Sequence, residues 1–115
     1  MEQRFDAAKA APGGLKALLG VHKYLDGGGL GPALLDMIYL RASQMNGCAY
    51  CTDMHWKDAR HHGVAEMKLA MLTAWRESPG FTERERAALE WTEAVTFLTV
   101  GHVPDEVFRV AREQF

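Results

Sequence analysis

Apolar residues recur three and four positions apart along most of the chain, the spacing that places them on one face of an α-helix. β-Branched residues are few and scattered, so no strand alternation is expected. Glycines, prolines and one capping box divide the pattern into about six helices. We expect these helices over residues 13–25, 32–45, from the cysteines at 48 and 51 to 62, 64–75, 82–101 and from 104 to the C-terminus.

The expected helix ends rest on a few residues with special backbone preferences. Gly27–Gly29 breaks the chain after the first helix, Asn46-Gly47 ends the second, and Gly63 stops the third. Thr82 and Glu85 form a capping box that starts the long fifth helix. No repeat, low-complexity tract or long linker interrupts the chain. The sequence therefore predicts one all-α domain over residues 1–115, a helical bundle.

Composition and charge exclude several classes of function. The 115 residues are 48% hydrophobic and 24% charged, the balance of a globular protein rather than a disordered one. The formal charge of −2 argues against a nucleic-acid or anionic-membrane partner. No apolar run is long enough to span a bilayer, and the first residues do not form a signal peptide. We expect a cytoplasmic protein, in a compartment that keeps thiols reduced.

Both cysteines lie in the stretch Cys48-Ala49-Tyr50-Cys51, and His55 follows four residues later. On a helix these three residues share one narrow stripe, and cysteines one turn apart can form a disulfide with little backbone movement. The break at Asn46-Gly47 is expected to put both cysteines in the first turn of a helix, where the macrodipole favours a thiolate. His55 stands one turn after Cys51, so the spacing makes Cys51 the activated thiol and Cys48 its disulfide partner.

Acids and further histidines add candidate site residues. Asp36 breaks an apolar run, which suggests a buried carboxylate in a proton relay with His55; alternatively it lies on a solvent face near Arg41 or Lys23. We expect the pair His61-His62 to complement the C-terminal dipole of its helix. For Glu93 we favour a solvated glutamate over the alternative of a buried acid that faces the site.

The motif Asn46-Gly47-Cys48-Ala49-Tyr50-Cys51 with His55, followed by Ala59-Arg60 and Gly63, resembles the AhpD-like alkyl hydroperoxidases of the carboxymuconolactone decarboxylase superfamily. The resemblance extends from about Gly31 to the end of the chain. It implies an all-helical fold, a disulfide centre borne on a helix and peroxide reduction. It also implies homo-oligomers, often trimers or hexamers. Family members often have a further apolar helix after the segment that corresponds to the last expected helix of this sequence.

By position, the resemblance makes Cys51 the peroxidatic thiolate, Cys48 the resolving cysteine and His55 the base. Asp36 stands twelve residues before Cys48, where the family commonly has a glutamate. Its shorter side chain suggests a bridging water between the carboxylate and the cysteines. The implied substrate is an organic hydroperoxide, and the implied reductant is an external dithiol or a protein. We expect no cofactor and no bound metal.

Other functions are compatible with parts of this pattern. A metal site would use Cys48, Cys51 and His55, with a fourth ligand from His61, His62 or His102. A general dithiol–disulfide oxidoreductase would use the same two cysteines without peroxide. Lactone decarboxylases of the superfamily generally lack the cysteine pair, and a helical interaction module would leave the thiols and the imidazole unexplained. We therefore favour a thiol-dependent peroxidase.

Overall fold

The computed structural model describes residues 4–115, and this part of the chain forms helices without strands. It divides into two compact units at Gly31. The first unit holds α1 (Ala7–Ala10) and α2 (Pro12–Asp26). The second unit holds α3 (Pro32–Met45), α4 (Ala49–His61), α5 (Glu66–Ala70), the 3₁₀ turn η1 (Leu72–Ala74), α6 (Glu83–Thr96), α7 (Leu98–Gly101) and α8 (Asp105–Gln114). The all-α class is confirmed, whereas a single domain over 1–115 stays a prediction.

The helices depart from the expected ones at three places. Asp6 caps a short helix, α1, that the apolar pattern does not predict. The segment expected as one helix over 64–75 forms α5 and then the tighter turn η1. The long fifth helix is interrupted at Phe97, and the chain continues as the separate short helix α7.

The first unit carries apolar side chains that remain exposed. Helix α2 follows Pro12, which suits the first helical position because it lacks an N–H group. None of the residues of α1 and α2 is buried. The large exposed apolar side chains of α2 are Leu18, Leu19, Val21, Tyr24 and Leu25. The face predicted by helical spacing therefore exists, but nothing within the first unit buries it.

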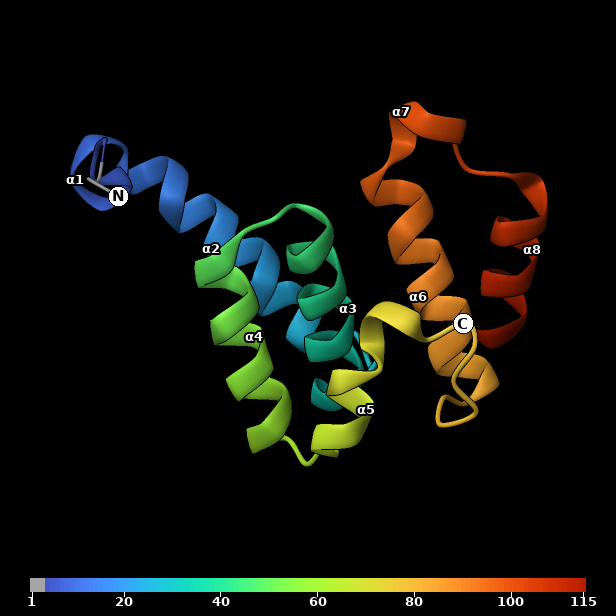
Figure 1. The fold of residues 1–115 in the computed structure, drawn as a ribbon. Coiled ribbons are helices and arrows are strands. Elements are labelled where there is room, and N and C mark those ends of the chain that lie inside the picture. Colours follow the sequence, from blue (N-terminus) through green and yellow to red (C-terminus); the bar gives the residue numbers. More distant parts are fainter. Residues whose placement is uncertain (1–3) are drawn as a thin grey trace. The chain divides into compact units, whose positions relative to one another are not determined.

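The second unit has a leucine core. Leu40 of α3, Leu72 of η1 and Leu89 of α6 are its largest fully buried side chains. Helix α3 packs against α4 and α6, and α6 packs against α8. Figure 1 shows α3 (teal) beside α4 (green) and α6 (orange) beside α8 (red). This arrangement makes α3 the central helix, and it carries α4 with the cysteine pair on one side.

A partly buried ion-pair cluster joins α3 to α6. The side chain of Glu93 is only 16% exposed, so the expectation of a solvated glutamate is wrong. It accepts hydrogen bonds from Arg41 Nε at 2.7 Å, from Trp75 Nε1 at 2.8 Å and from Arg76. Burial alone raises the pKa of Glu93, but the hydrogen bonds from Arg76, Trp75 and Arg41 outweigh it and hold the pKa below its ordinary value.

Within residues 4–115, no helix is long and apolar enough to cross a lipid bilayer. The longest helix, α2, has 15 residues, whereas a membrane span needs about 20.

We predict that Glu93→Gln destabilises the protein by about 2 kcal/mol, because it removes the charge that compensates the half-buried Arg41. Since folding lowers the pKa of Glu93, its contribution to stability is present at neutral pH and is lost as the pH falls below the ordinary value of 4.5. The variant should therefore lose less of its remaining stability on acidification. Urea unfolding at neutral and acidic pH measures both effects.

Glu90→Gln is the matched control, because Glu90 lies on the same helix and its contact with Arg76 is longer, at 3.6 Å, and more exposed. It should change stability by less than about 1 kcal/mol. Equal losses in the two variants would contradict the assignment of Glu93 as the structural acid.

Candidate functional site

The cysteine pair lies at a junction where one helix ends and the next begins. At the end of α3, the N–H of Gly47 bonds to Gln44 O at 3.2 Å and the N–H of Cys48 bonds to Ser43 O at 3.1 Å. This is the Schellman pattern, with Gly47 in the left-handed conformation at φ 65°. Cys48 then serves as the N-cap of α4. The confirmed break at Asn46-Gly47 thus fixes the backbone of Cys48 from both sides.

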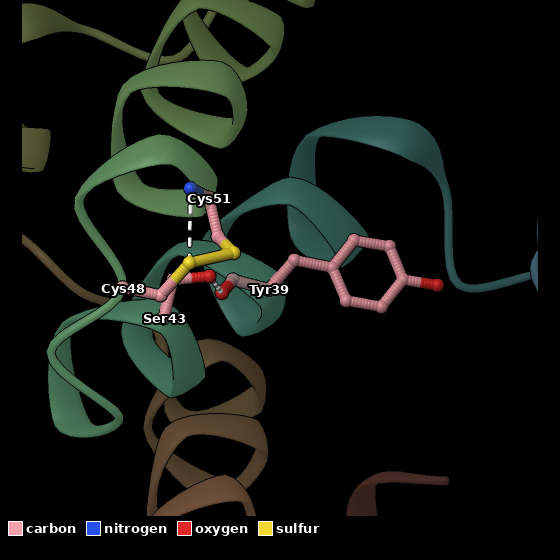
Figure 2. Close-up of a disulfide and its surroundings, with 4 residues drawn as sticks. All are labelled: Tyr39, Ser43, Cys48 and Cys51. Atoms are coloured by element: carbon pink, nitrogen blue, oxygen red, sulfur yellow. Dashed lines mark hydrogen bonds between the residues drawn. A yellow bond between two sulfur atoms is a disulfide. The ribbon is translucent and has the colours of Figure 1, made fainter. Parts of the chain in front are cut away.

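Cys48 and Cys51 form a disulfide, with their Cα atoms 5.4 Å apart (Figure 2). Cys48 precedes the first helical residue, so the expectation that both cysteines lie within the first turn is correct only for Cys51. The backbone N–H of Cys51 donates to Cys48 Sγ at 3.3 Å. Both residues are half-buried, and neither is sealed in the core. The helix terminus thus directs an N–H donor at the sulfur of Cys48.

Ser43 and Tyr39 of α3 support the disulfide junction. Ser43 is buried, and its hydroxyl donates to the carbonyl of Tyr39 at 2.6 Å while its own carbonyl receives the N–H of Cys48. In Figure 2 the ring of Tyr39 points away from the sulfurs. This ring lies against His55 instead, with centroids 5.1 Å apart. Helix α3 therefore contacts both ends of the motif.

His55 lies on α4 one turn after Cys51, and its side chain is 14% exposed. Its Nδ1 atom is 3.9 Å from Oδ2 of Asp58, one turn further along the same helix. Tyr39 and Asp58 thus restrict the ring on two sides. The imidazole is held in a sheltered place on the helix face that continues from Cys51.

Asp36 is 8% exposed, so the alternative in which it faces solvent near Arg41 or Lys23 is wrong. Its Oδ2 atom lies 2.6 Å from Nδ1 of His62, at the C-cap of α4. His62 therefore does more than complement the helix dipole. An oxygen of Asp36 also lies within 4.8 Å of a ring nitrogen of His55. This distance is compatible with a proton relay between Asp36 and His55. The short hydrogen bond of Asp36, however, is the one to His62.

Metal binding would draw on two different sets of side chains. In the described part of the chain, donor atoms of Asp36, His55 and Asp58 lie within 4.8 Å of one another. Asp36 is already engaged by His62, and Asp58 is half exposed. The set predicted as an alternative, Cys48 and Cys51 with His55, has its two sulfurs bonded to each other. Thiolate ligation at these positions would require the reduced protein.

The structure adds Asp58 to the residues expected from the sequence, and it places His62, expected as a dipole partner or an alternative metal ligand, beside Asp36. Cys48, Cys51, His55, Asp58 and His62 follow one another at intervals of three or four residues. The helical stripe used to group the cysteines with His55 thus continues to the end of α4. Periodicity was a sufficient signal for both residues, but only the packing of α3 against α4 places Asp36 beside His62.

Comparisons with known proteins find a matching family model, two relatives and a similar solved structure. A model of the carboxymuconolactone decarboxylase family matches residues 12–94. The chain is 38% identical, over all of its 115 residues and 78% of the relative, to the uncharacterised protein YdfG of Bacillus subtilis (strain 168). It is 37% identical over 68 residues, which are 58% of the chain and 37% of the relative, to the uncharacterised protein YnjA of Escherichia coli (strain K12).

A crystal structure from Agrobacterium tumefaciens has the same fold, with a TM-score of 0.93 and 42% identity over 99% of this chain and 78% of that one. That protein, ATU0492, is described as of unknown function and is provisionally assigned as the antioxidant defence protein AhpD.

We predict that Gly47→Val destabilises the oxidised protein by about 1–3 kcal/mol, because a β-branched residue is strained at φ 65°. A Cβ atom added at Gly47 would face open space, so a steric clash does not contribute. Gly47→Asn is the control, since asparagine adopts the left-handed region at lower cost. Urea unfolding of the three proteins should rank them glycine, asparagine, valine in decreasing stability. Equal stabilities for asparagine and valine would contradict the backbone explanation.

Proposed function

This chain belongs to the carboxymuconolactone decarboxylase family and is AhpD-like, and on that premise we propose that it is a thiol-dependent peroxidase with Cys48 and Cys51 as its redox couple. The observation that carries the proposal is the disulfide between these residues at the N-terminus of α4. The expected compartment, the cytoplasm, would supply the reducing equivalents that reopen it.

The proposed reaction proceeds in three steps. The thiolate of Cys51 attacks one oxygen of an organic hydroperoxide; an S–O bond forms, the O–O bond breaks, and the alkoxide leaves as an alcohol after taking a proton. The thiol of Cys48 then attacks the sulfenic sulfur of Cys51, and the two sulfurs join as water leaves. An external dithiol reduces this disulfide and is itself oxidised to a disulfide.

The N–H donor at Cys48 supports a division of roles between the two sulfurs. When a reductant attacks a disulfide, one sulfur is bonded by the incoming thiol and the other leaves as a thiolate. The Cys51 N–H lies 3.3 Å from Cys48 Sγ and would stabilise negative charge there. Cys48 is then the better leaving group, and the reductant attacks Cys51. Cys51 thus reacts with both the peroxide and the external dithiol.

His55 is the proposed base for Cys51, because it lies one helical turn away on the same stripe and is sheltered by Tyr39. In the first step it takes the thiol proton and returns it to the departing alkoxide. Asp36 has a proposed supporting role through its proximity to His55. The same residues would also serve a dithiol–disulfide oxidoreductase, which differs in lacking the reaction with peroxide.

We predict that one equivalent of an organic hydroperoxide removes both free thiols from the reduced native protein. In Cys48→Ser the reaction should stop at a sulfenic acid on Cys51, which a dimedone adduct and mass spectrometry detect. Cys51→Ser should leave Cys48 reduced on the same timescale. His55→Ala should slow the oxidation of Cys51 about 100-fold at neutral pH, because proton transfer is lost.

Asp53→Ala is a suitable control, since its contact with Lys57 is exposed on α4 and outside the proposed site. It should be oxidised at the native rate. If peroxide leaves the thiols of the native protein intact while a dithiol still exchanges with the disulfide, the protein is a dithiol–disulfide oxidoreductase and not a peroxidase. A sulfenic acid found on Cys48 in the Cys51→Ser variant would reverse the assigned roles.

We also propose that the chain works as a homo-oligomer. Helix α2 bears a row of exposed apolar side chains, including Leu18 and Val21. Exposed apolar surface of this kind is typical of subunit contacts. An isolated helix of this length is only marginally stable in water, so contact with another chain would stabilise it.

Light scattering after size-exclusion chromatography should therefore give a mass that is a multiple of 12.8 kDa. Leu18→Glu should lower the assembled fraction at a given concentration, because it places a charge on the apolar face. Lys16→Glu introduces the same side chain at a polar position of α2 and should leave assembly unchanged. A native mass of one chain would contradict the proposal.

A further inference from the structure

A second imidazole engages the buried carboxylate of the site. His62 Nδ1 lies 2.6 Å from Asp36 Oδ2, and this contact joins the middle of the apolar run in α3 to the C-cap of α4. The side chain of Asp36 is 11% exposed and that of His62 is 38% exposed. The pair therefore connects a sheltered carboxylate to the surface through a single imidazole.

The place of His62 is fixed by the way α4 ends. The N–H of Gly63 bonds to Arg60 O at 3.2 Å and that of Val64 bonds to Ala59 O at 2.9 Å, with Gly63 at φ 86°. This is the same Schellman pattern that ends α3. The buried Ala59 and Val64 anchor the turn in the core. The backbone of His62 is thus held by a structured turn, and the hydrogen bond to Asp36 places its ring.

Asp36 also lies near the imidazole of His55. One of its oxygens lies within 4.8 Å of a ring nitrogen of His55, which is the base in the proposed function. An ionised carboxylate has two oxygens that accept hydrogen bonds, so a single Asp36 side chain is able to serve both rings. A carboxylate that orients an imidazole affects how readily that imidazole accepts a proton. A side chain that fixes the orientation of the Asp36 carboxylate is therefore placed to influence how readily His55 accepts a proton.

We infer that His62 is a positioning residue of the thiol centre: its Nδ1–H holds the Asp36 carboxylate beside His55, and the reactivity of Cys51 depends on that contact. The inference rests on the proposed function for the role of His55 as base. The inference concerns the arrangement of His62, Asp36 and His55 in the reduced protein without peroxide. The reactivity of the Cys51 thiol towards an alkylating reagent therefore tests it.

The side chains around this pair come from the two helices that form the site. The titratable and charged groups concerned are Asp36 and Tyr39 from α3, and His55, Asp58, Arg60 and His61 from α4. Arg60 is directed to the carbonyl of Val64 at 2.7 Å, and the ring of His61 makes an edge contact with that of His62. His61 thus has the chemistry of His62 and lies next to it, but its ring meets His62 rather than Asp36, which makes it the matched control.

The test measures alkylation of Cys51 by iodoacetamide in a Cys48→Ser background, as a function of pH. His62→Ala should slow alkylation at neutral pH about fivefold, the effect of losing one hydrogen bond. The midpoint of the rate–pH curve should move to higher pH while the plateau at high pH stays unchanged, because the intrinsic reactivity of the thiolate is not altered. A general structural defect would instead change the plateau.

His62→Asn places an amide N–H close to the position of Nδ1 and should restore most of the rate. His61→Ala should behave like the parent protein. A native curve for His62→Ala, or an asparagine variant as slow as the alanine variant, would overturn the inference. Failure of peroxide to oxidise the native thiols would overturn the proposed function alone, because alkylation requires no peroxide.

Discussion

Helix α3 ends in a left-handed glycine, and the residue after it begins the next helix. Gly47 allows the turn, and Cys48 donates its N–H to the carbonyl of Ser43 while its sulfur receives the N–H of Cys51. One residue therefore completes the end of α3 and caps the start of α4. The placement of the disulfide, the exit direction of α4 and the stripe of side chains along it all depend on this short junction.

From that junction, α4 sets the spacing of the site. Each of its chemically active side chains follows the previous one by three or four residues, from the sulfurs to His55 and on to His62 at the far end. Helix α3 runs beside it and supplies Ser43 and Tyr39 at the end near the sulfurs and near His55, and Asp36 at the other end. The disulfide and the partly exposed imidazole of His62 thus lie at opposite ends of one helix–helix contact.

The ion-pair cluster at Glu93 has a separate role from this site. It fixes α6 against α3, and three donors share one carboxylate. Arg41, which the sequence suggested as a neighbour of Asp36, belongs to this cluster. The central helix thus takes part in two polar clusters: the one at Glu93 holds α6 against α3, and the one at Asp36 joins α3 to His62 at the end of α4.

Local signals determined most of the secondary structure and the first half of the site. Helical spacing and the residues Gly47, Gly63 and Thr82 were sufficient to place the main helix ends, because capping involves backbone groups only a few residues apart. The same locality groups Cys48, Cys51 and His55. The interruption at Phe97 and the short 3₁₀ turn after α5 escaped prediction, since a continuous apolar pattern does not report where a helix loses its regular hydrogen bonds.

What only the tertiary structure decided are the contacts between side chains far apart in the chain. Asp36 and His62 are separated by 26 residues, and Arg41 and Glu93 by 52. Periodicity says which face of a helix a residue occupies, but it does not say which residue of another helix stands opposite. That depends on how far two packed helices slide and rotate against each other, which the whole core determines. The sequence by itself therefore grouped the two cysteines with His55 on one helix face, whereas the tertiary structure decided that His62 lies beside Asp36.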